Sequence, residues 1–214
     1  MDKRLPDFVV VEGPIGVGKT SLARRLAETF SVDILLECAV KNPFLPEFYK
    51  NPESAALPTQ LHFLFQRLKQ VEQLRQSDMF HPIKISDFLM DKDKLFAKVT
   101  LNEAEYDLYL KIYNNVITDT PVPDLVIYLQ ANPDILLKRI LERGIDYEMN
   151  IDEQYLKKIN DAYIDYFYHY DASPLLIINT ENFDLVNNTD NYNLLLEHIS
   201  RLPPGRHYFN PGKF

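Results

Sequence analysis

Residues 13–20 have the residue types of a loop that binds phosphate. They read Gly13-Pro14-Ile15-Gly16-Val17-Gly18-Lys19-Thr20, which fits the pattern G-x-x-x-x-G-K-[ST]. Glycines let backbone N–H groups curl around phosphate oxygens without a clash from Cβ atoms. In such a loop the lysine reaches the β- and γ-phosphates of a triphosphate, and the hydroxyl ligates Mg²⁺. The pattern predicts nucleotide binding, but alone it does not separate a kinase from a motor, a GTPase or a regulator.

The segments on either side of this loop are those that the motif requires. Phe8-Val9-Val10-Val11 is a continuous apolar run, typical of a strand that is buried on both faces of a parallel sheet. Residues 19–30 follow with Leu22, Leu26 and Ala27 spaced to share one face of a helix. The N-terminus of that helix adds its positive end to the phosphate site. A strand, a loop and a helix in this order favour the nucleotide-binding interpretation over a glycine-rich turn that binds nothing.

Two carboxylates stand at the ends of other expected strands. Residues 32–36 indicate a strand that ends at Glu37, and residues 83–85 a short strand that ends near Asp87. Ligands of open α/β sheets bind beyond the carboxyl ends of the strands, so both side chains should face the loop. Asp87 can then hold Mg²⁺ directly or through water, and Glu37 can orient an acceptor hydroxyl and take its proton. The alternative for each is a helix cap or an exposed surface carboxylate.

Strands and helices alternate along the rest of the chain. We expect helices over about 57–76, 102–118, 133–143, 152–170 and 190–200, and strands over 125–129 and 174–178. Gly144 can close one of these helices and Asp152 can cap the next. The alternation predicts an α/β protein with a five-stranded parallel sheet flanked by helices. We expect a single domain over residues 1–214, with an irregular tail at 203–214.

The composition excludes several classes of function. The formal net charge of −8 argues against non-specific nucleic-acid binding, which needs a basic surface. Cys38 is the one cysteine, so no intramolecular disulfide forms, which fits a reducing compartment. No long apolar stretch follows residues 1–6, and the longest apolar runs have strand length. We therefore expect a cytoplasmic protein that binds neither nucleic acid nor membrane.

The motifs together resemble the deoxynucleoside kinases, the family of deoxycytidine, deoxyguanosine and deoxyadenosine kinases. The likeness runs from about residue 7 to residue 180. The loop at 13–20 fits the family, and Glu37 stands at the position of the glutamate that contacts the 5′-hydroxyl as a base. The stretch from Asn42 to Glu53 is similar to the family segment whose tyrosine contacts the sugar 3′-hydroxyl. The resemblance implies that role for Tyr49.

The resemblance also implies which residues read the base. Gln60 and Arg67 fit the spacing of the family's base-reading glutamine and arginine, and a glutamine can both donate and accept hydrogen bonds. Asp87 stands at the first acid of the family's acid–Arg–Ser motif. Asp93, six positions later, stands at a second acid and with Arg67 resembles the pair that reads the base. Phe96 is implied as the aromatic face that stacks on the base.

Residues 138–144 resemble the lid that clamps the phosphates of ATP, which would cover about residues 139–150. Arg139 and Arg143 lie four positions apart, hence on one helix face, where two cations can stabilise charge on the phosphoryl group. Basic residues are also common in the last turn of a helix for purely structural reasons, so this role depends on the resemblance. Glu148 occupies the position of a lid glutamate that contacts the sugar.

Two positions depart from the family pattern. Asp87-Phe88-Leu89 stands where the family has acid–Arg–Ser, so the arginine that positions the 5′-hydroxyl and the phosphates is absent. Ile145 stands where a second lid arginine is expected. Loss of one preorganised donor at such a site can cost about 3 kcal/mol. Lys84, Lys92 and Lys94 are near enough in sequence to substitute, and their spacing does not choose among them.

The resemblance implies a three-layer P-loop kinase fold with a short helical lid. It further implies a homodimer that serves nucleotide salvage by using ATP and Mg²⁺ to phosphorylate the 5′-hydroxyl of a 2′-deoxynucleoside. Deoxyadenosine or deoxyguanosine is favoured over deoxycytidine. Two alternatives stay open: a nucleoside-monophosphate kinase such as thymidylate kinase, and a non-catalytic nucleotide-binding scaffold of the same fold. The base-reading residues argue against the monophosphate kinase. The intact loop and carboxylates argue against the non-catalytic scaffold, although a scaffold would be expected to lose arginines as this chain has done at two positions.

Overall fold

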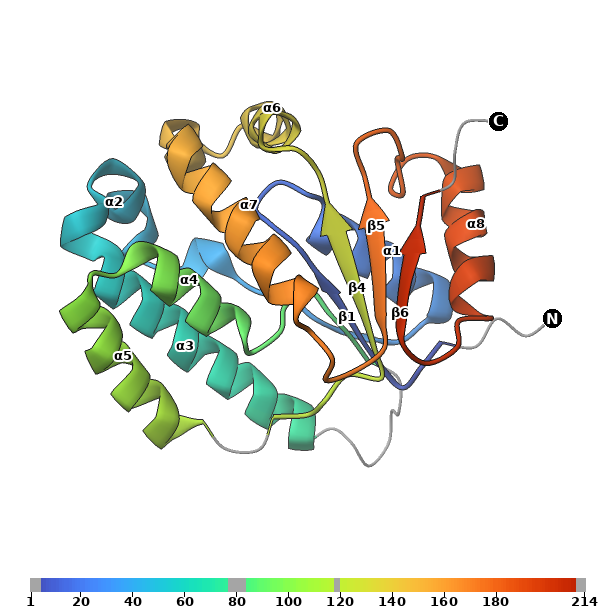
Figure 1. Ribbon diagram of the computed structural model, residues 1–214, viewed down its shortest axis with the longest axis horizontal. Helices are drawn as coiled ribbons and strands as arrows, with labels where there is room; N and C mark the ends of the chain where they lie inside the picture. Colours follow the sequence, from blue (N-terminus) through green and yellow to red (C-terminus); the bar gives the residue numbers. More distant parts are fainter. Residues whose placement is uncertain (1–4, 77–83, 118–119, 211–214) are drawn as a thin grey trace.

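The apolar run at residues 8–11 becomes the central strand of a parallel sheet (Figure 1). The computed structural model describes residues 5–76, 84–117 and 120–210. The sheet has the order β2-β3-β1-β4-β5-β6. Each pair of neighbouring strands is parallel; Val9, for example, pairs with Ile85 on one side and Leu125 on the other. The strands are β1 (Phe8–Glu12), β2 (Asp33–Leu35), β3 (Lys84–Ser86), β4 (Leu125–Gln130), β5 (Leu175–Asn179) and β6 (Arg206–Phe209).

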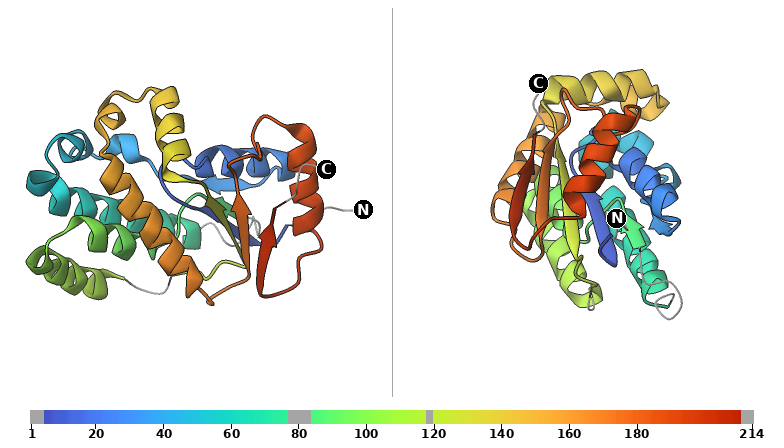
Figure 2. Two further views of the ribbon diagram at one scale, coloured as in Figure 1. Left: turned by 45° about the horizontal axis from the view of Figure 1, so that its top comes forward. Right: turned by 90° about the vertical axis from the view of Figure 1, so that its right-hand side faces the viewer.

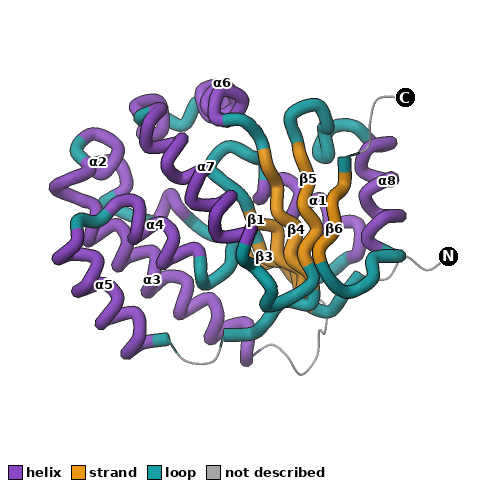
Figure 3. The backbone as a smooth tube through the Cα atoms, in the orientation of Figure 1, coloured by secondary structure: helices purple, strands orange, loops and turns teal. Residues whose placement is uncertain are grey.

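Helices cover both faces of this sheet, which gives the predicted three layers (Figures 2 and 3). Successive side chains of a strand point to opposite faces. Val9 and Val11 accordingly pack in one core with α1, α6 and α8, and Val10 packs in another with α4 and α7. The helices are α1 (Lys19–Phe30), α2 (Leu45–Lys50), α3 (Pro52–Gln76), α4 (Lys92–Thr100), α5 (Glu103–Val116), α6 (Pro133–Arg143), α7 (Glu153–Tyr168) and α8 (Thr189–Ile199), with short 3₁₀ helices η1 (Ala39–Lys41) and η2 (Asp146–Asn150).

The sheet has six strands, so the prediction of five is wrong. The additional strand, β6, lies in the tail that we expected to be irregular, and its Phe209 pairs with Ile178 of β5. Its pattern in the sequence is weak because it has four residues, of which only Phe209 is buried, directly after Pro203-Pro204-Gly205. Residues 211–214 of the predicted tail lie outside the described residues.

Two helices and the start of a third were not predicted from the sequence. The long helix α3 begins at Pro52 rather than near residue 57 and contains Pro58. A proline within a helical pattern usually marks a boundary, whereas proline at the first helical position is well tolerated. The short helices α2 and α4 were not predicted at all. Residues 83 and 118, predicted as the ends of a strand and a helix, lie outside the described residues.

The predicted helix boundaries around the lid segment are confirmed. Gly144 follows α6 in the left-handed conformation, with φ of 67°, and its N–H bonds the carbonyl groups of Ile140 and Leu141. The side chain of Asp152 accepts a hydrogen bond of 2.9 Å from the N–H of Tyr155 at the start of α7. The end of α6 at Gly144 and the start of α7 after Asp152 thus delimit the segment that contains η2. Within the described part of the chain, no helix is both long enough and apolar enough to cross a membrane.

Candidate active site

The phosphate loop follows β1 and packs tightly against β4 and α6. Gly13 and Gly16 have φ of 150° and 83°. A Cβ atom on Gly16 would lie 2.8 Å from the carbonyl oxygen of Leu136, and one on Gly13 would lie 2.4 Å from that of Leu129. Both contacts are with backbone atoms, which cannot move aside as a flexible side chain can. The glycines are therefore required by the packing of the loop as well as by its conformation.

Lys19, the first residue of α1, points back over the loop. Its Nζ donates a hydrogen bond of 3.0 Å to the carbonyl oxygen of Pro14. Burial lowers the pKa of Lys19 to about 8, and the positive charge of Lys92 acts in the same direction. The carboxylates of Glu12 and Glu37 oppose this shift without cancelling it. A cation held in this way gains stability when an anion such as a phosphate arrives.

Asp87, directly after β3, connects α1, the helix that follows the phosphate loop, to the segment after β2. Its Oδ2 accepts a hydrogen bond of 2.5 Å from the hydroxyl of Thr20. Its Oδ1 accepts one of 2.7 Å from the backbone N–H of Glu37. The expected convergence of the two carboxylates at one edge of the sheet is therefore confirmed. A hydroxyl beside a carboxylate offers the hard oxygen atoms that Mg²⁺ prefers, so the residues fit this ion.

Glu37 is held between two buried cations. Its Oε2 accepts a hydrogen bond of 2.6 Å from Nζ of Lys92, and its Oε1 forms an ion pair with Arg67. Burial would raise the pKa of Glu37, but the charges of Arg67 and Lys92 outweigh it and lower the pKa to about 2. Glu37 is thus ionised at any physiological pH.

Arg67 bridges Glu37 and Asp93 from the middle of α3. Its second guanidinium nitrogen pairs with Oδ1 of Asp93, which is fully buried in the first turn of α4. The expected Arg67–Asp93 pair is therefore present. Burial raises the pKa of Asp93, while Arg67 opposes this shift. Within the described part of the chain, Oδ2 of Asp93 makes no hydrogen bond, but Asp93 is fully buried and, unlike Arg67, is not among the residues that line the pocket described below.

One pocket, here called the central pocket, brings together most of the residues singled out from the sequence. It is lined by Ile15, Gly16, Lys19, Thr20, Glu37, Tyr49, Gln60, Arg67, Asp87, Phe96 and Arg143. It is also lined by Lys92, one of the three lysines considered as a substitute for the absent arginine, and by residues that were not predicted from the sequence: Ala39, Leu45, Phe48, Thr59, Phe63 and Tyr155. Several of these lie on α2 and α4, the two helices that were not predicted. The apolar and aromatic members could not be told from core residues by their pattern alone.

Glu148 lies beside the central pocket rather than in its wall. It is buried on η2 and pairs with Arg143 at the end of α6. Tyr49 stacks on Tyr147, with ring centroids 6.0 Å apart, and burial raises the pKa of Tyr49 well above its usual value, with Tyr155 and Glu148 adding to the shift. The lid segment and α2 thus meet beside Tyr49 and Arg143, two residues of the pocket wall.

Arg139 does not join Arg143 in the central pocket. Its guanidinium donates to the hydroxyl of Thr180 at 3.0 Å and to the carbonyl oxygen of Thr180 at 2.6 Å. There it lines a second cavity, between residues 17–22 of the loop and helix and residues 180–187 after β5. The spacing of four residues predicted that both arginines share one helix face, but their side chains line different cavities.

A model of the deoxynucleoside kinase family matches residues 9–202 of the chain. The chain belongs to this family. The deoxyguanosine kinase of Bacillus subtilis is 33% identical over 203 residues, which cover 91% of this chain and 97% of that protein. The deoxyadenosine kinase of Lactobacillus acidophilus is 31% identical over 205 residues, covering 89% and 94%. A solved deoxyadenosine kinase from M. mycoides, with products dCMP and dCDP bound, has the same fold, with a TM-score of 0.78 over 90% of this chain and 98% of that one at 24% identity.

The family and the kinase class predicted from the sequence are therefore confirmed. One further residue of this kinase was missed. Glu12, the last residue of β1, is almost fully buried and accepts hydrogen bonds from the N–H of Gly13 at 2.8 Å, the N–H of Leu89 at 3.0 Å and the hydroxyl of Tyr163 at 2.9 Å. It holds the loop, the segment after β3 and α7 together. An acid that ends an apolar strand directly before the phosphate loop is the signal that could have revealed it.

Proposed function

We propose that this kinase transfers the γ-phosphoryl group of ATP to the 5′-hydroxyl of a 2′-deoxynucleoside, with deoxyadenosine or deoxyguanosine preferred. The observation that carries the proposal is the shared wall of the central pocket. The phosphate-loop residues Lys19 and Thr20 stand there with the ionised carboxylate of Glu37. Gln60 and Arg67, which offer hydrogen bonds to a base, line the same pocket. A triphosphate end and a nucleoside would therefore meet at Glu37.

The transfer needs the phosphoryl group, the metal and the hydroxyl to be aligned. The loop would hold the phosphates, with Lys19 at the β- and γ-phosphates, and the Thr20 hydroxyl and Asp87 would hold Mg²⁺. When bound, this ion neutralises charge that develops on the phosphate oxygens. The bond from the 5′-oxygen to phosphorus forms while the bond to the ADP oxygen breaks, and the hydroxyl proton passes to Glu37. Arg143, at the edge of the pocket, would stabilise the phosphoryl group in flight.

The low pKa of Glu37 limits what the carboxylate can do as a base. A pKa of about 2 makes it a weak acceptor for the proton of an alcohol. Phosphoryl transfer has a loose transition state, in which positioning and charge stabilisation contribute most. We therefore assign Glu37 first the role of holding the 5′-hydroxyl in line, and second that of accepting its proton once the new bond has largely formed.

The remaining residues would recognise the nucleoside. Tyr49 and Glu148 would contact the sugar 3′-hydroxyl. Gln60, Arg67 and Asp93 would read the base, with Phe96 against its face. The purine preference is supported by the relatives that are named as deoxyguanosine and deoxyadenosine kinases.

The cavity beside residues 180–187 is separate from the central pocket, and the two have no lining residue in common. Because this cavity adjoins the phosphate loop at Val17 and Gly18 and lies outside the central pocket, we assign it to the nucleoside end of ATP. In this assignment Arg139 contacts the donor rather than the group in flight, and the lid at about 139–150 closes over both. We also propose that the protein is a cytoplasmic homodimer with a role in nucleotide salvage; the single cysteine and the family resemblance support this.

A phosphorylation assay with the four deoxynucleosides and Mg-ATP tests the proposal. We expect a 5′-monophosphate and ADP in equal amounts, fastest with a purine deoxynucleoside. Turnover of nucleoside monophosphates alone would instead indicate chemistry like that of thymidylate kinase. ATP binding without turnover of any acceptor would indicate a non-catalytic scaffold.

A further inference from the structure

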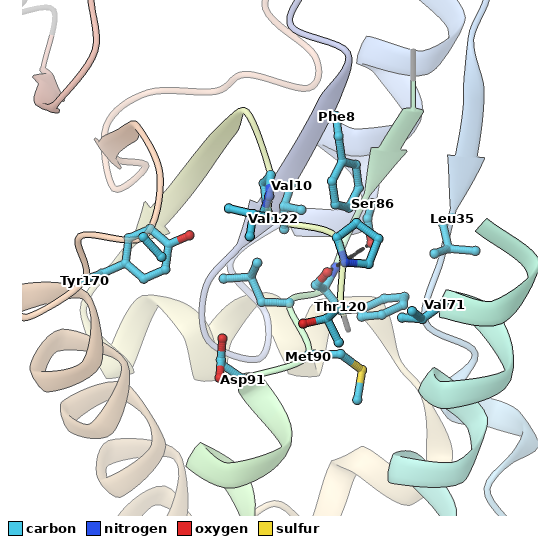
Figure 4. A pocket seen from close by; sticks show the side chains of 15 residues that line it. Phe8, Val10, Leu35, Val71, Ser86, Met90, Asp91, Thr120, Val122 and Tyr170 are labelled. Carbon is cyan, nitrogen blue, oxygen red and sulfur yellow. Dashed lines mark hydrogen bonds between the residues drawn. The ribbon is translucent and has the colours of Figure 1, made fainter. Parts of the chain in front are cut away.

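The backbone position that carries an arginine in the family is turned away from the central pocket. Phe88 is buried and lines a different, mostly apolar pocket. Figure 4 shows this pocket, with Phe8, Val10 and Leu35 among the labelled residues of its wall. Its ring lies 5.8 Å from the guanidinium carbon of Arg67, so it packs against that cation and brings none of its own. The charge lost at this position has to come from another part of the chain if the site is to keep it.

Three lysines are near in sequence, and the structure separates them. Lys84 stands at the start of β3, three residues before Asp87. It therefore lies toward the amino end of the strand, whereas the phosphate loop lies beyond the carboxyl ends. Lys94 is on α4, but its side chain is 44% exposed and pairs with Asp91 at 3.2 Å. Lys92 alone of the three lines the central pocket; its side chain is 5% exposed and its Nζ lies 2.6 Å from Oε2 of Glu37.

The placement of Lys92 is unfavourable for the helix that carries it. Lys92 is the first residue of α4, where the positive end of the helix dipole disfavours a cation. Its ammonium also faces the space that Lys19 faces, and the two charges repel. Burial alone would lower the pKa of Lys92, but the carboxylate of Glu37, 2.6 Å from its Nζ, outweighs burial and raises the pKa, so the side chain keeps its charge in the pocket. Residues that conflict with local preference in this way are typical of functional sites.

We propose that Lys92 is a catalytic residue that replaces the absent arginine. Its ammonium group has three N–H donors, of which one holds the carboxylate of Glu37. The other two are available to the oxygen atoms of the transferring phosphoryl group and to the 5′-oxygen. The cation thus reaches the reaction centre from the first turn of α4 rather than from the end of β3. This inference rests on the proposed phosphoryl transfer and adds a residue to it.

The test distinguishes a role for the charge of Lys92 at the phosphoryl group from a role only in holding Glu37 in place. Lys92→Gln keeps a hydrogen-bond donor for Glu37 but removes the charge, and Lys92→Arg restores a charge. Lys94→Gln is the matched control, since it removes an exposed lysine two positions along the same helix. We expect Lys92→Gln to lower kcat about 100-fold, which is the effect of removing one such donor, while the Kd of the nucleoside changes far less. Lys92→Arg should recover at least about a tenth of wild-type kcat, and Lys94→Gln should match the wild type.

The other outcomes contradict either the role of Lys92 or the proposed function. If Lys92→Gln turns over within about threefold of the wild type, the lysine only supports Glu37 and the inference is wrong. It is equally wrong if Lys92→Arg is as slow as Lys92→Gln while both unfold at the wild-type temperature. If Lys92→Gln does not fold, Lys92→Arg decides, because full loss of kcat in a folded arginine variant contradicts a role of charge. If the wild type itself phosphorylates no deoxynucleoside, the proposed function fails and this inference with it.

Discussion

The hydroxyl of Thr20 lies 2.5 Å from Oδ2 of Asp87 and donates a hydrogen bond to it. This contact ties the first turn of α1 to the end of β3. The other oxygen of Asp87 accepts a hydrogen bond from the backbone N–H of Glu37. One buried carboxylate therefore sets the position of the proposed Mg²⁺ ligands relative to Glu37, the residue proposed to hold the acceptor hydroxyl. The proposed metal site and the proposed base are therefore mechanically linked.

Replacement of Asp87 by asparagine should weaken the use of Mg²⁺ more than it weakens the fold. The amide has the shape of the carboxylate but lacks the charge that attracts the ion. We expect the Mg²⁺ concentration for half-maximal activity to rise at least about tenfold. Initial rates across a Mg²⁺ titration measure this. Asp91→Asn, at a partly exposed carboxylate outside the central pocket, is the control and should leave the titration unchanged.

Substitution of Gly16 by alanine should disturb the phosphate loop. The new Cβ would lie 2.8 Å from a backbone oxygen of α6, and φ of 83° is already unfavourable for alanine. We expect the Kd of ATP to rise at least about tenfold, because the loop must shift to relieve the contact. Gly205→Ala is the control, since it has φ of 112° but no atom within 4 Å of the added Cβ. Equal ATP affinities in the two variants, measured by calorimetry, would show that the contact does not shape the loop.

ATP binding should take up a proton in mildly alkaline solution. The pKa of Lys19 is about 8 in the free protein, so the side chain is mostly neutral above that pH. A triphosphate favours the charged ammonium and raises the pKa, so binding takes up as much as about one proton near pH 9, and the affinity falls as the pH rises. Calorimetry in two buffers of different ionisation enthalpy measures the uptake. Lys19→Arg stays charged throughout and should show none of it.

The convergence of loop and carboxylates could be predicted from sequence because it follows from topology. Parallel strands place their carboxyl ends at one edge, so Glu37 and Asp87 had to face residues 13–20 once the strands were recognised. Gln60 and Arg67 were assigned to the site from the family resemblance rather than from topology, and both residues line the central pocket.

What could not be predicted depends on packing rather than on pattern. Lys92 was one of three candidate lysines because α4 itself was not recognised, and only the helix start brings this side chain to Glu37. Arg139 was expected to act beside Arg143, but periodicity does not give the direction of a long side chain, and Arg139 turns to Thr180. Strand β6 was missed because an edge strand of four residues has little apolar pattern.

The transfer step itself tests the central claim, that the carboxylate of Glu37 holds the acceptor hydroxyl in line with the bound triphosphate. Single-turnover transfer from Mg-ATP to a purine deoxynucleoside should be measured for the wild type and for Glu37→Gln, with both ligands saturating. We expect the variant to bind both ligands and to transfer at least about 100-fold more slowly, because the neutral amide lacks the charge that holds the hydroxyl in line and cannot take its proton late in the step. Transfer at the wild-type rate by Glu37→Gln would contradict the account.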